Sequence, residues 1–405
     1  MKQTIIQYYK EHQIPIMQQD LNDKNLGIYY GREMETGEPI FLTRVLSSSP
    51  TGFVSGFPGT GIALAVKQEL LNVLLSSDDE VFILDLHGDF CSLANEIGGE
   101  VVQIGGGFCN GVNPLSWYPS PWEEEFVLFK QDFLKTFIKG ILEEPKEFSP
   151  AQISIINRSV SNLYQSKSDK DLYSISLYDF YEELKKQAGS EAQELERKMM
   201  ECLQCPTTFS IGQGVSIRNR FTVFDLSKVY CQFKTVSLLA VTEFVWNRVM
   251  NSEKSRTTDK YQHIWLYFND INGFLKTEES TEYIRNLSKR CRTQGCVPTF
   301  ITKQTSEILN NDITRTMISN SGFIQLFYQE PAVREELAYL LALDSKKLAY
   351  ISNNVPGSGL IYADRVNGCV KSDFIPFQYN ALKEKFNGFR LGSTGGGKAG
   401  RLEIF

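Results

Sequence analysis

A glycine-rich turn is the first place where this sequence could do chemistry. In the segment SGFPGTGIA, four residues separate Gly56 from Gly61, which is the glycine spacing of the Walker A loop that binds nucleotide phosphates. The glycines of such a loop permit a tight turn, and the backbone N–H groups that open the following helix face the phosphates. The sequence therefore predicts a nucleotide- or anion-binding loop made of Gly56, Pro58, Gly59, Thr60, Gly61, Ile62 and Ala63.

The two residues after Gly61 are the wrong types for binding Mg-ATP. A Walker A loop has a lysine there, whose ammonium contacts the phosphates, and then a serine or threonine whose hydroxyl binds Mg²⁺. Ile62 and Ala63 supply neither group. Each lost charge-assisted contact costs about 1.5–3 kcal/mol. We therefore expect no tightly bound cofactor, and ATP with Mg²⁺ only if the altered site still functions, although the backbone alone could attract phosphate or sulfate.

A second group of candidates ends the apolar segment IWLYF. An aspartate usually stands there for the magnesium shell, followed by a glutamate for the attacking water, but this chain has Asn269 and Asp270. The neutral Asn269 is a weaker partner for Mg²⁺, and Asp270 is one methylene shorter than glutamate. Because strand side chains alternate between faces, Asp270 should point away from the site unless a bulge intervenes. These two are the candidate catalytic residues, in altered form.

Further candidates follow other predicted strands. Lys303 comes directly after VPTFIT and is a candidate substitute cation for a phosphate; the alternative is an ion pair with Asp270 or Asp85. Asp85, Gly88 and Asp89, in LDLHGDF, follow the second strand, where ligands bind in parallel sheets, but a turn formed by aspartate and glycine is the favoured explanation. Lys67 is expected to be a solvated or packing side chain.

Three more features have simpler explanations. Arg290 and Arg292 could reach a neighbouring subunit's nucleotide or could lie on the exposed face of the helix TEYIRNLSKRCR. The tail GSTGGGK imitates a phosphate loop but lacks the preceding strand and the following helix, so a linker is expected. Cys202 and Cys205 form a CxxC without a second ligand pair, and the eight cysteines are expected to be free thiols, with no metal site.

The bulk properties fit a globular protein without a broad nucleic-acid surface. The chain has 405 residues, is 42% hydrophobic and carries a formal charge of −6, which gives no general attraction for a polyanion. No segment has the uninterrupted apolar length of a membrane span or the apolar core of a signal peptide. We expect a cytoplasmic protein that touches a membrane only through partners.

Alternating segment types organise these candidates. Two short extended segments, GIYYG and PIFLTRV, precede the strand GFV, the glycine-rich turn, a helical pattern and the strand EVFILDL, which is a strand–helix–strand unit. Long helical stretches follow, and strand signals resume at RFTVFDL, IWLYFND, VPTFITK, FIQLFY and GSGLIYAD. We predict an α/β, RecA-like P-loop core with a mainly parallel sheet. Its predicted parts are a leader (1–24), a first core part (25–120), a helical insertion (121–204), a second core part (205–384) and a flexible tail (385–405).

The ordered set GIYYG, phosphate loop, DLHGD, GVNPL, helical stretch, RFTVFDL, IWLYFND, RTQGCVPTFIT and GSGLIYAD resembles the motor domain of the cytoplasmic ATPases of type IV secretion and conjugative DNA transfer. These VirB/TraC-type proteins are relatives of the HerA/FtsK hexameric motors, and the resemblance covers residues 25–383. It implies partners in a secretion apparatus, a hexamer, and a docking domain ahead of the motor. The family pattern would place Lys at Ile62, Ser or Thr at Ala63, Asp at Asn269, Glu at Asp270 and Gln at Lys303.

All five positions differ from the family pattern, so the resemblance implies the motor fold without its usual chemistry. The leading hypothesis is an ATPase-like subunit that hydrolyses ATP barely or not at all and serves a transfer machine structurally or as a regulator. An active ATPase that uses Lys303 and Asp270 in altered roles is the alternative. A module that binds single-stranded DNA without ATP, and a site altered in the laboratory, are two further hypotheses.

Overall fold

The computed structural model describes residues 1–12, 27–105, 112–115, 123–142, 147–165, 175–203, 217–252, 263–366, 369–370 and 373–379. Within these residues all strands belong to one sheet, in the order β12-β11-β2-β1-β13-β10-β9-β3-β8-β7-β4-β6-β5. The strands are β1 (Ile28–Glu33), β2 (Pro39–Leu42), β3 (Gly52–Ser55), β4 (Glu80–Asp85), β5 (Glu100–Gln103), β6 (Phe221–Asp225), β7 (Ile264–Asn269), β8 (Cys296–Thr302), β9 (Phe323–Leu326), β10 (Ser358–Ala363), β11 (Arg365–Val366), β12 (Cys369–Val370) and β13 (Ile375–Gln378).

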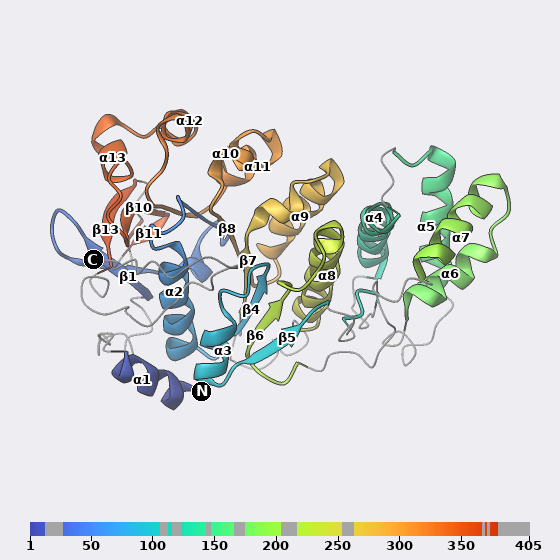
Figure 1. Cartoon of the computed structure of the whole chain (residues 1–405), viewed down its shortest axis with the longest axis horizontal. Coiled ribbons are helices and arrows are strands. Elements are labelled where there is room, and N and C mark those ends of the chain that lie inside the picture. Colours follow the sequence, from blue (N-terminus) through green and yellow to red (C-terminus); the bar gives the residue numbers. More distant parts are fainter. Residues whose placement is uncertain are drawn as a thin grey trace, which may run out of the picture.

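Helices cover the sheet and extend beyond it (Figure 1). The α-helices are α1 (Lys2–Glu11), α2 (Ile62–Ser76), α3 (Cys91–Ile97), α4 (Glu123–Ile141), α5 (Pro150–Gln165), α6 (Leu177–Lys185), α7 (Ser190–Leu203), α8 (Lys234–Ser252), α9 (Glu278–Cys291), α10 (Thr305–Leu309), α11 (Asp312–Ser319), α12 (Pro331–Leu341) and α13 (Ser345–Tyr350). Short 3₁₀ turns are η2 (Arg44–Leu46), η4 (Cys231–Phe233) and η6 (Ile271–Phe274).

The half of the sheet that holds the phosphate loop is parallel. β3 pairs in parallel with β8 and β9, β7 pairs with β8 and β4, and β6 pairs with β4 and β5. The other half, which consists of β10, β13, β1, β2, β11 and β12 in sheet order, is antiparallel. The predicted α/β class is therefore confirmed, and β3, which precedes the glycine-rich loop, lies beside β8, which ends just before Lys303.

The apolar run of β4 is unbroken because both faces of this strand are covered. Val81 and Ile83 pack in the core cluster that includes α1, α2 and α3, whereas Phe82 and Leu84 pack in the cluster that includes α4 to α9. A parallel strand between two helical layers is buried on each side. All four side chains have no exposed surface, so the carboxyl end of β4 is held rigidly.

The described residues between β5 and β6 form helices α4 to α7 and no strand, in the segment where a helical insertion is predicted. Figure 1 shows α5, α6 and α7 lying beyond α4, away from the sheet. Helix α4 joins this group to the core through α8 and α9, because buried Lys130 contacts Glu243 of α8 and Lys139 contacts Glu279 of α9. The boundaries 121 and 204 stay a prediction.

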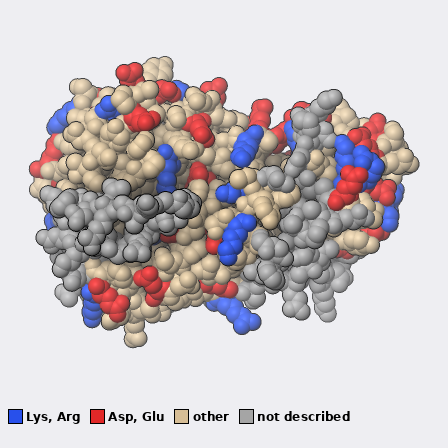
Figure 2. All heavy atoms as spheres, in the orientation of Figure 1, with Lys and Arg blue, Asp and Glu red and all other residues tan. Residues whose placement is uncertain are grey.

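The first described residues are part of the packed structure. Ile5, Tyr8 and Tyr9 of α1 are buried in the same cluster as α2 and α3, and the Tyr9 hydroxyl donates to Asn72 Oδ1 at 2.8 Å. The predicted leader 1–24 thus begins with a docked helix. Among the described residues, no helix combines the length and apolar character that a membrane crossing requires. On the face shown in Figure 2, acidic and basic side chains are interspersed and form no broad basic surface.

Candidate functional site

The phosphate loop has the predicted backbone form. Residues 56–61 connect β3 to α2, and Gly59 and Gly61 take positive φ angles of 83° and 104°. The loop is fastened to its neighbours, since Phe57 N donates to Tyr328 O and Gly357 N donates to Thr60 O, both at 2.9 Å. The loop conformation therefore rests on contacts within the protein.

No side chain at the start of α2 replaces the missing lysine and hydroxyl. Ile62 is 4% exposed and belongs to the apolar core beside α2. Ala63, at the next position, is half-buried. The Thr60 hydroxyl is committed to Phe57 O, to which it donates at 2.7 Å, and its side chain is buried. The loop thus offers backbone N–H groups only.

Asp85, the last residue of β4, organises the loop that follows it. Its carboxylate accepts from the backbone N–H groups of His87, Gly88 and Phe90 at 3.2, 3.0 and 2.8 Å. Burial raises the pKa of Asp85, although the Phe90 and Asn269 hydrogen bonds oppose this rise. This geometry is that of a turn-forming aspartate, one of the two explanations open from the sequence.

Asn269 bridges two carboxylates. It lies opposite Asp85 in the β4–β7 register, and its Nδ2 donates to Asp85 Oδ1 at 2.8 Å and to Asp89 Oδ2 at 3.3 Å. An ionised carboxylate only accepts hydrogen bonds, so these contacts fix the NH₂ group of the amide toward the aspartates. Asn269 therefore presents donors at the position where the family pattern has a metal-binding oxygen.

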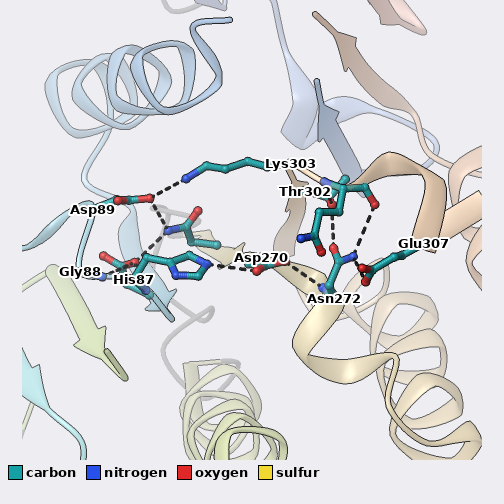
Figure 3. A network of polar contacts seen from close by, with 11 residues as sticks. His87, Gly88, Asp89, Asp270, Asn272, Thr302, Lys303 and Glu307 are labelled. Carbon is teal, nitrogen blue, oxygen red and sulfur yellow. Dashed lines mark hydrogen bonds and ion pairs between the residues drawn. The ribbon is translucent and has the colours of Figure 1, made fainter. Parts of the chain in front are cut away.

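Lys303 does form an ion pair, but with neither predicted partner. Its Nζ lies 3.0 Å from Asp89 Oδ2, rather than beside Asp270 or Asp85 (Figure 3). Asp89 is reached because the turn organised by Asp85, with Gly88 at a φ of 77°, brings this residue back over the sheet edge. Burial raises the pKa of Asp89, but the charge of Lys303 and its hydrogen bond outweigh burial and leave this pKa below its usual value.

Lys67 is a packing side chain, one of its two predicted states. Its Nζ lies 5.5 Å from the centre of the Phe90 ring. Burial lowers the pKa of Lys67, while the nearby charges of Asp89 and Asp85 oppose that change. It adds positive charge to the surroundings of the two aspartates.

Asp270 was expected to point away from the site as a strand residue would. The structure differs because the strand ends before Asp270. β7 stops at Asn269, and Asp270 takes φ 80° and ψ 81°, outside the extended region. Strand alternation no longer applies there, and the carboxylate turns so that Oδ2 lies 3.1 Å from His87 Nε2. Its Oδ1 accepts from Asn272 N at 3.2 Å.

Four residues at this edge were not predicted from the sequence. His87 faces Asp270, and Asn272 connects the end of β8 to α10: it accepts from Thr302 Oγ1 at 2.7 Å and donates to Glu307 Oε2 at 2.7 Å (Figure 3). His87 lies within LDLHGDF, so its position two residues after Asp85 was an available signal. Asn272, Thr302 and Glu307 carry no such signal, because their contacts depend on how η6 folds.

The two candidate arginines lie near the amino end of β8, opposite the strand ends that hold Lys303 and Asp85. Arg290 and Arg292 precede the start of β8, whereas Lys303 follows its end. The Arg290 guanidinium stacks on Phe129 of α4, 3.8 Å from the ring centre, and Arg292 is exposed at the end of α9. Within this chain, the fold does not bring them to the phosphate loop.

Among the residues that the structure describes, no cluster of three or more His, Cys, Asp or Glu side chains could hold a metal ion. Cys205 of the CxxC pair and the imitation loop from Gly392 to Lys398, with the rest of the predicted flexible tail, lie outside the described residues. The expectations for these segments stay predictions.

No protein-family model matches the sequence, and no curated protein matches it. Solved structures are similar to this chain. VirB4 of Thermoanaerobacter pseudethanolicus is similar with a TM-score of 0.69 and 18% identity, over 90% of this chain and 98% of that chain. The plasmid coupling protein TrwB in complex with ADP and Mg²⁺ has a TM-score of 0.55 and 10% identity, over 90% of this chain and 91% of that chain. A TrwB structure in complex with sulphate gives the same TM-score and identity. These similarities show the fold that the sequence resemblance predicts.

Proposed function

We propose that this chain is a subunit of a conjugation or type IV secretion machine that keeps the motor fold without productive hydrolysis of ATP. It would act on the cytoplasmic side, assembled with other subunits, to support or regulate an active ATPase. The similarity to VirB4 and TrwB supports the fold on which this proposal rests. The side chains of the site support the loss of hydrolysis.

One observation carries the proposal. Asn269 donates hydrogen bonds to Asp85 and Asp89, and Lys303 pairs with Asp89 at the same point. A strand end that binds Mg²⁺ must present oxygen acceptors toward the ion, but here an amide NH₂ group and an ammonium group face the carboxylates. The phosphate loop adds no compensating cation, since Ile62 is buried in the core.

The fold itself does not exclude nucleotide, since TrwB has been solved with ADP and Mg²⁺. What differs in this chain is the side-chain set. Losing the lysine, the hydroxyl and the aspartate together weakens Mg-ATP binding by about 5–9 kcal/mol, which turns a micromolar site into a millimolar one or worse. The proposal therefore concerns these residues and not the backbone loop, which can still attract an anion.

The proposal is tested by calorimetric titration of ATP and ADP, with and without Mg²⁺. The native chain should show no binding at micromolar concentrations. A variant with Ile62→Lys, Ala63→Ser, Asn269→Asp and Lys303→Gln should gain it. A control with Ile62→Met, Ala63→Val and Asn269→Gln changes the same loop and strand end without adding ammonium, hydroxyl or carboxylate, and should show no binding.

Magnesium-dependent ATP turnover by the native chain would contradict the proposal and favour the alternative, an ATPase that uses Asp270 and Lys303. One contact gives that alternative a definite form, because Asp270 is oriented by His87 at 3.1 Å. In that case Asp270→Asn and Lys303→Gln should each abolish the turnover. Turnover that survives both changes would indicate a contaminating enzyme.

A further inference from the structure

Lys303 crosses the end of a neighbouring strand to reach its partner. β7 lies between β8 and β4 in the sheet; Lys303 follows β8, and Asp89 belongs to the loop after β4. The ion pair therefore spans the end of β7, where Asn269 lies between the two partners. Figure 3 shows the Lys303 side chain extended toward Asp89 across this gap.

The residues at this edge do not fit the divalent metal that the fold class implies. Mg²⁺ needs oxygen ligands in near-octahedral geometry. Asp85 already accepts from three backbone N–H groups and from Asn269, so its oxygens are occupied by donors. Asn269 turns its NH₂ group, not its oxygen, toward both carboxylates.

We infer that Lys303 is a resident cation that takes the place of the divalent metal and ties the ends of β4, β7 and β8 together. The ammonium supplies a positive charge to Asp89, and Asn269 donates hydrogen bonds to both Asp85 and Asp89. The site edge is thus assembled in the absence of nucleotide. This inference rests on the proposed function, because both concern the same strand ends.

The charge balance at the edge supports this role. Asp85 is fully buried and has its hydrogen-bond partners in backbone N–H groups and Asn269. Asp89 is therefore the carboxylate that Lys303 neutralises. Lys303 makes the direct contact with Asp89 at 3.0 Å, while Lys67 contributes from beside the Phe90 ring. Lysine suits this position because its ammonium is a compact point charge with three donors on a long stem. A metal binding at Asp89 Oδ2 would have to displace that ammonium.

The test uses Mn²⁺ alone, without nucleotide, on four purified proteins: the native chain, Asn269→Asp, Lys303→Gln, and the double variant. Binding is measured from the loss of the free Mn²⁺ signal in electron paramagnetic resonance. Only the double variant removes the resident cation and also restores a carboxylate between Asp85 and Asp89. It should bind Mn²⁺ at least about tenfold more tightly than Asn269→Asp alone.

Equal Mn²⁺ affinity in Asn269→Asp and in the double variant would overturn the inference, because Lys303 would then not be competing with the metal. No gain in either variant would also overturn it. Circular dichroism and Tm establish that each variant is folded. An Asn269→Asp/Lys303→Arg variant provides a second comparison, which should behave like Asn269→Asp alone. ATP is absent throughout, so the result is separable from failure of the proposed function.

Discussion

Gly357 closes over the phosphate loop at Gly61: a Cβ atom on Gly61 would lie 2.7 Å from the Gly357 amide nitrogen. The adjacent hydrogen bond from Gly357 N to Thr60 O, at 2.9 Å, fixes the same contact. The last turn of the loop is therefore specified by a segment far along the chain. Such a loop can keep its form without a bound phosphate.

This contact predicts different costs for replacing Gly59 and Gly61, two glycines of the same loop. Gly59→Ala meets no atom within 4 Å and pays only for its φ of 83°, about 1–2 kcal/mol. Gly61→Ala adds a clash with the Gly357 backbone to a φ of 104° and should cost clearly more. Denaturant unfolding of both variants measures the difference. Equal losses would mean that the Gly357 segment moves away freely.

The single substitution Ile62→Lys should destabilise the folded protein. Ile62 is 4% exposed, so Ile62→Lys places an ammonium in an apolar site without a phosphate partner and should cost at least about 2 kcal/mol. Ile62→Met keeps the volume and should cost less than about 1.5 kcal/mol. Unfolding curves with and without ADP measure both effects. A fully stable Ile62→Lys variant would show that the new side chain escapes to solvent.

A buried ion pair should contribute to the attachment of helix α4 to the core. Lys130 and Glu243 have fully buried side chains. The Lys130 ammonium also donates to Pro114 O at 2.8 Å and to Asn247 Oδ1 at 2.9 Å, and Tyr283 OH donates to Glu243 Oε2 at 2.8 Å. Lys130→Met leaves the Glu243 charge without its cation and should cost about 3–5 kcal/mol.

Adding Glu243→Gln to Lys130→Met supplies the matched comparison for this ion pair. The double variant removes both charges and should recover part of the loss, because the largest penalty comes from the unpaired carboxylate. Equilibrium unfolding of the two single variants and the double variant gives the coupling free energy. If the double variant is destabilised by the sum of the single effects, the pair does not act as a unit.

Local patterns predicted the parallel half of the fold and the place of the site. β4, the loop at Gly56 and α2 follow from apolar runs and glycine spacing. The antiparallel half was less visible: β13 is a four-residue strand that includes Pro376, and its assignment depends on pairing with β1 and β10. Short strands are decided by their distant neighbours, which a local pattern does not contain.

The site shows the same limit at the level of single residues. Lys303, Asp85 and Asn269 were each predicted at the end of a strand, and the structure shows that these strands, β8, β4 and β7, are neighbours. The partner of Lys303 was wrong, because the turn after Asp85 decides which carboxylate comes within reach. The Asp270 interaction was missed because the backbone leaves the strand at a positive φ. Both outcomes depend on loop conformations that residue spacing alone does not specify.

The ion pair between Lys303 and Asp89 should make the stability of the folded protein depend on pH in the acid range. Lys303 lowers the pKa of Asp89 in the folded chain, and an unfolded aspartate titrates near about 3.9. A lowered pKa stabilises the folded state above the unfolded value, and this contribution is lost as the pH falls through the folded one. Lys303→Gln should therefore lower Tm most at about pH 6–7 and least below about pH 3.

Asp85, whose pKa is raised by burial, changes the stability with pH in the opposite direction. Because Asp85 is present in both proteins, its contribution largely cancels in the difference between their Tm values. Calorimetric Tm values for the native chain and Lys303→Gln across this range measure the effect. A Tm difference that stays constant with pH would show that the side chain of Lys303 stabilises the edge by packing rather than by its charge on Asp89.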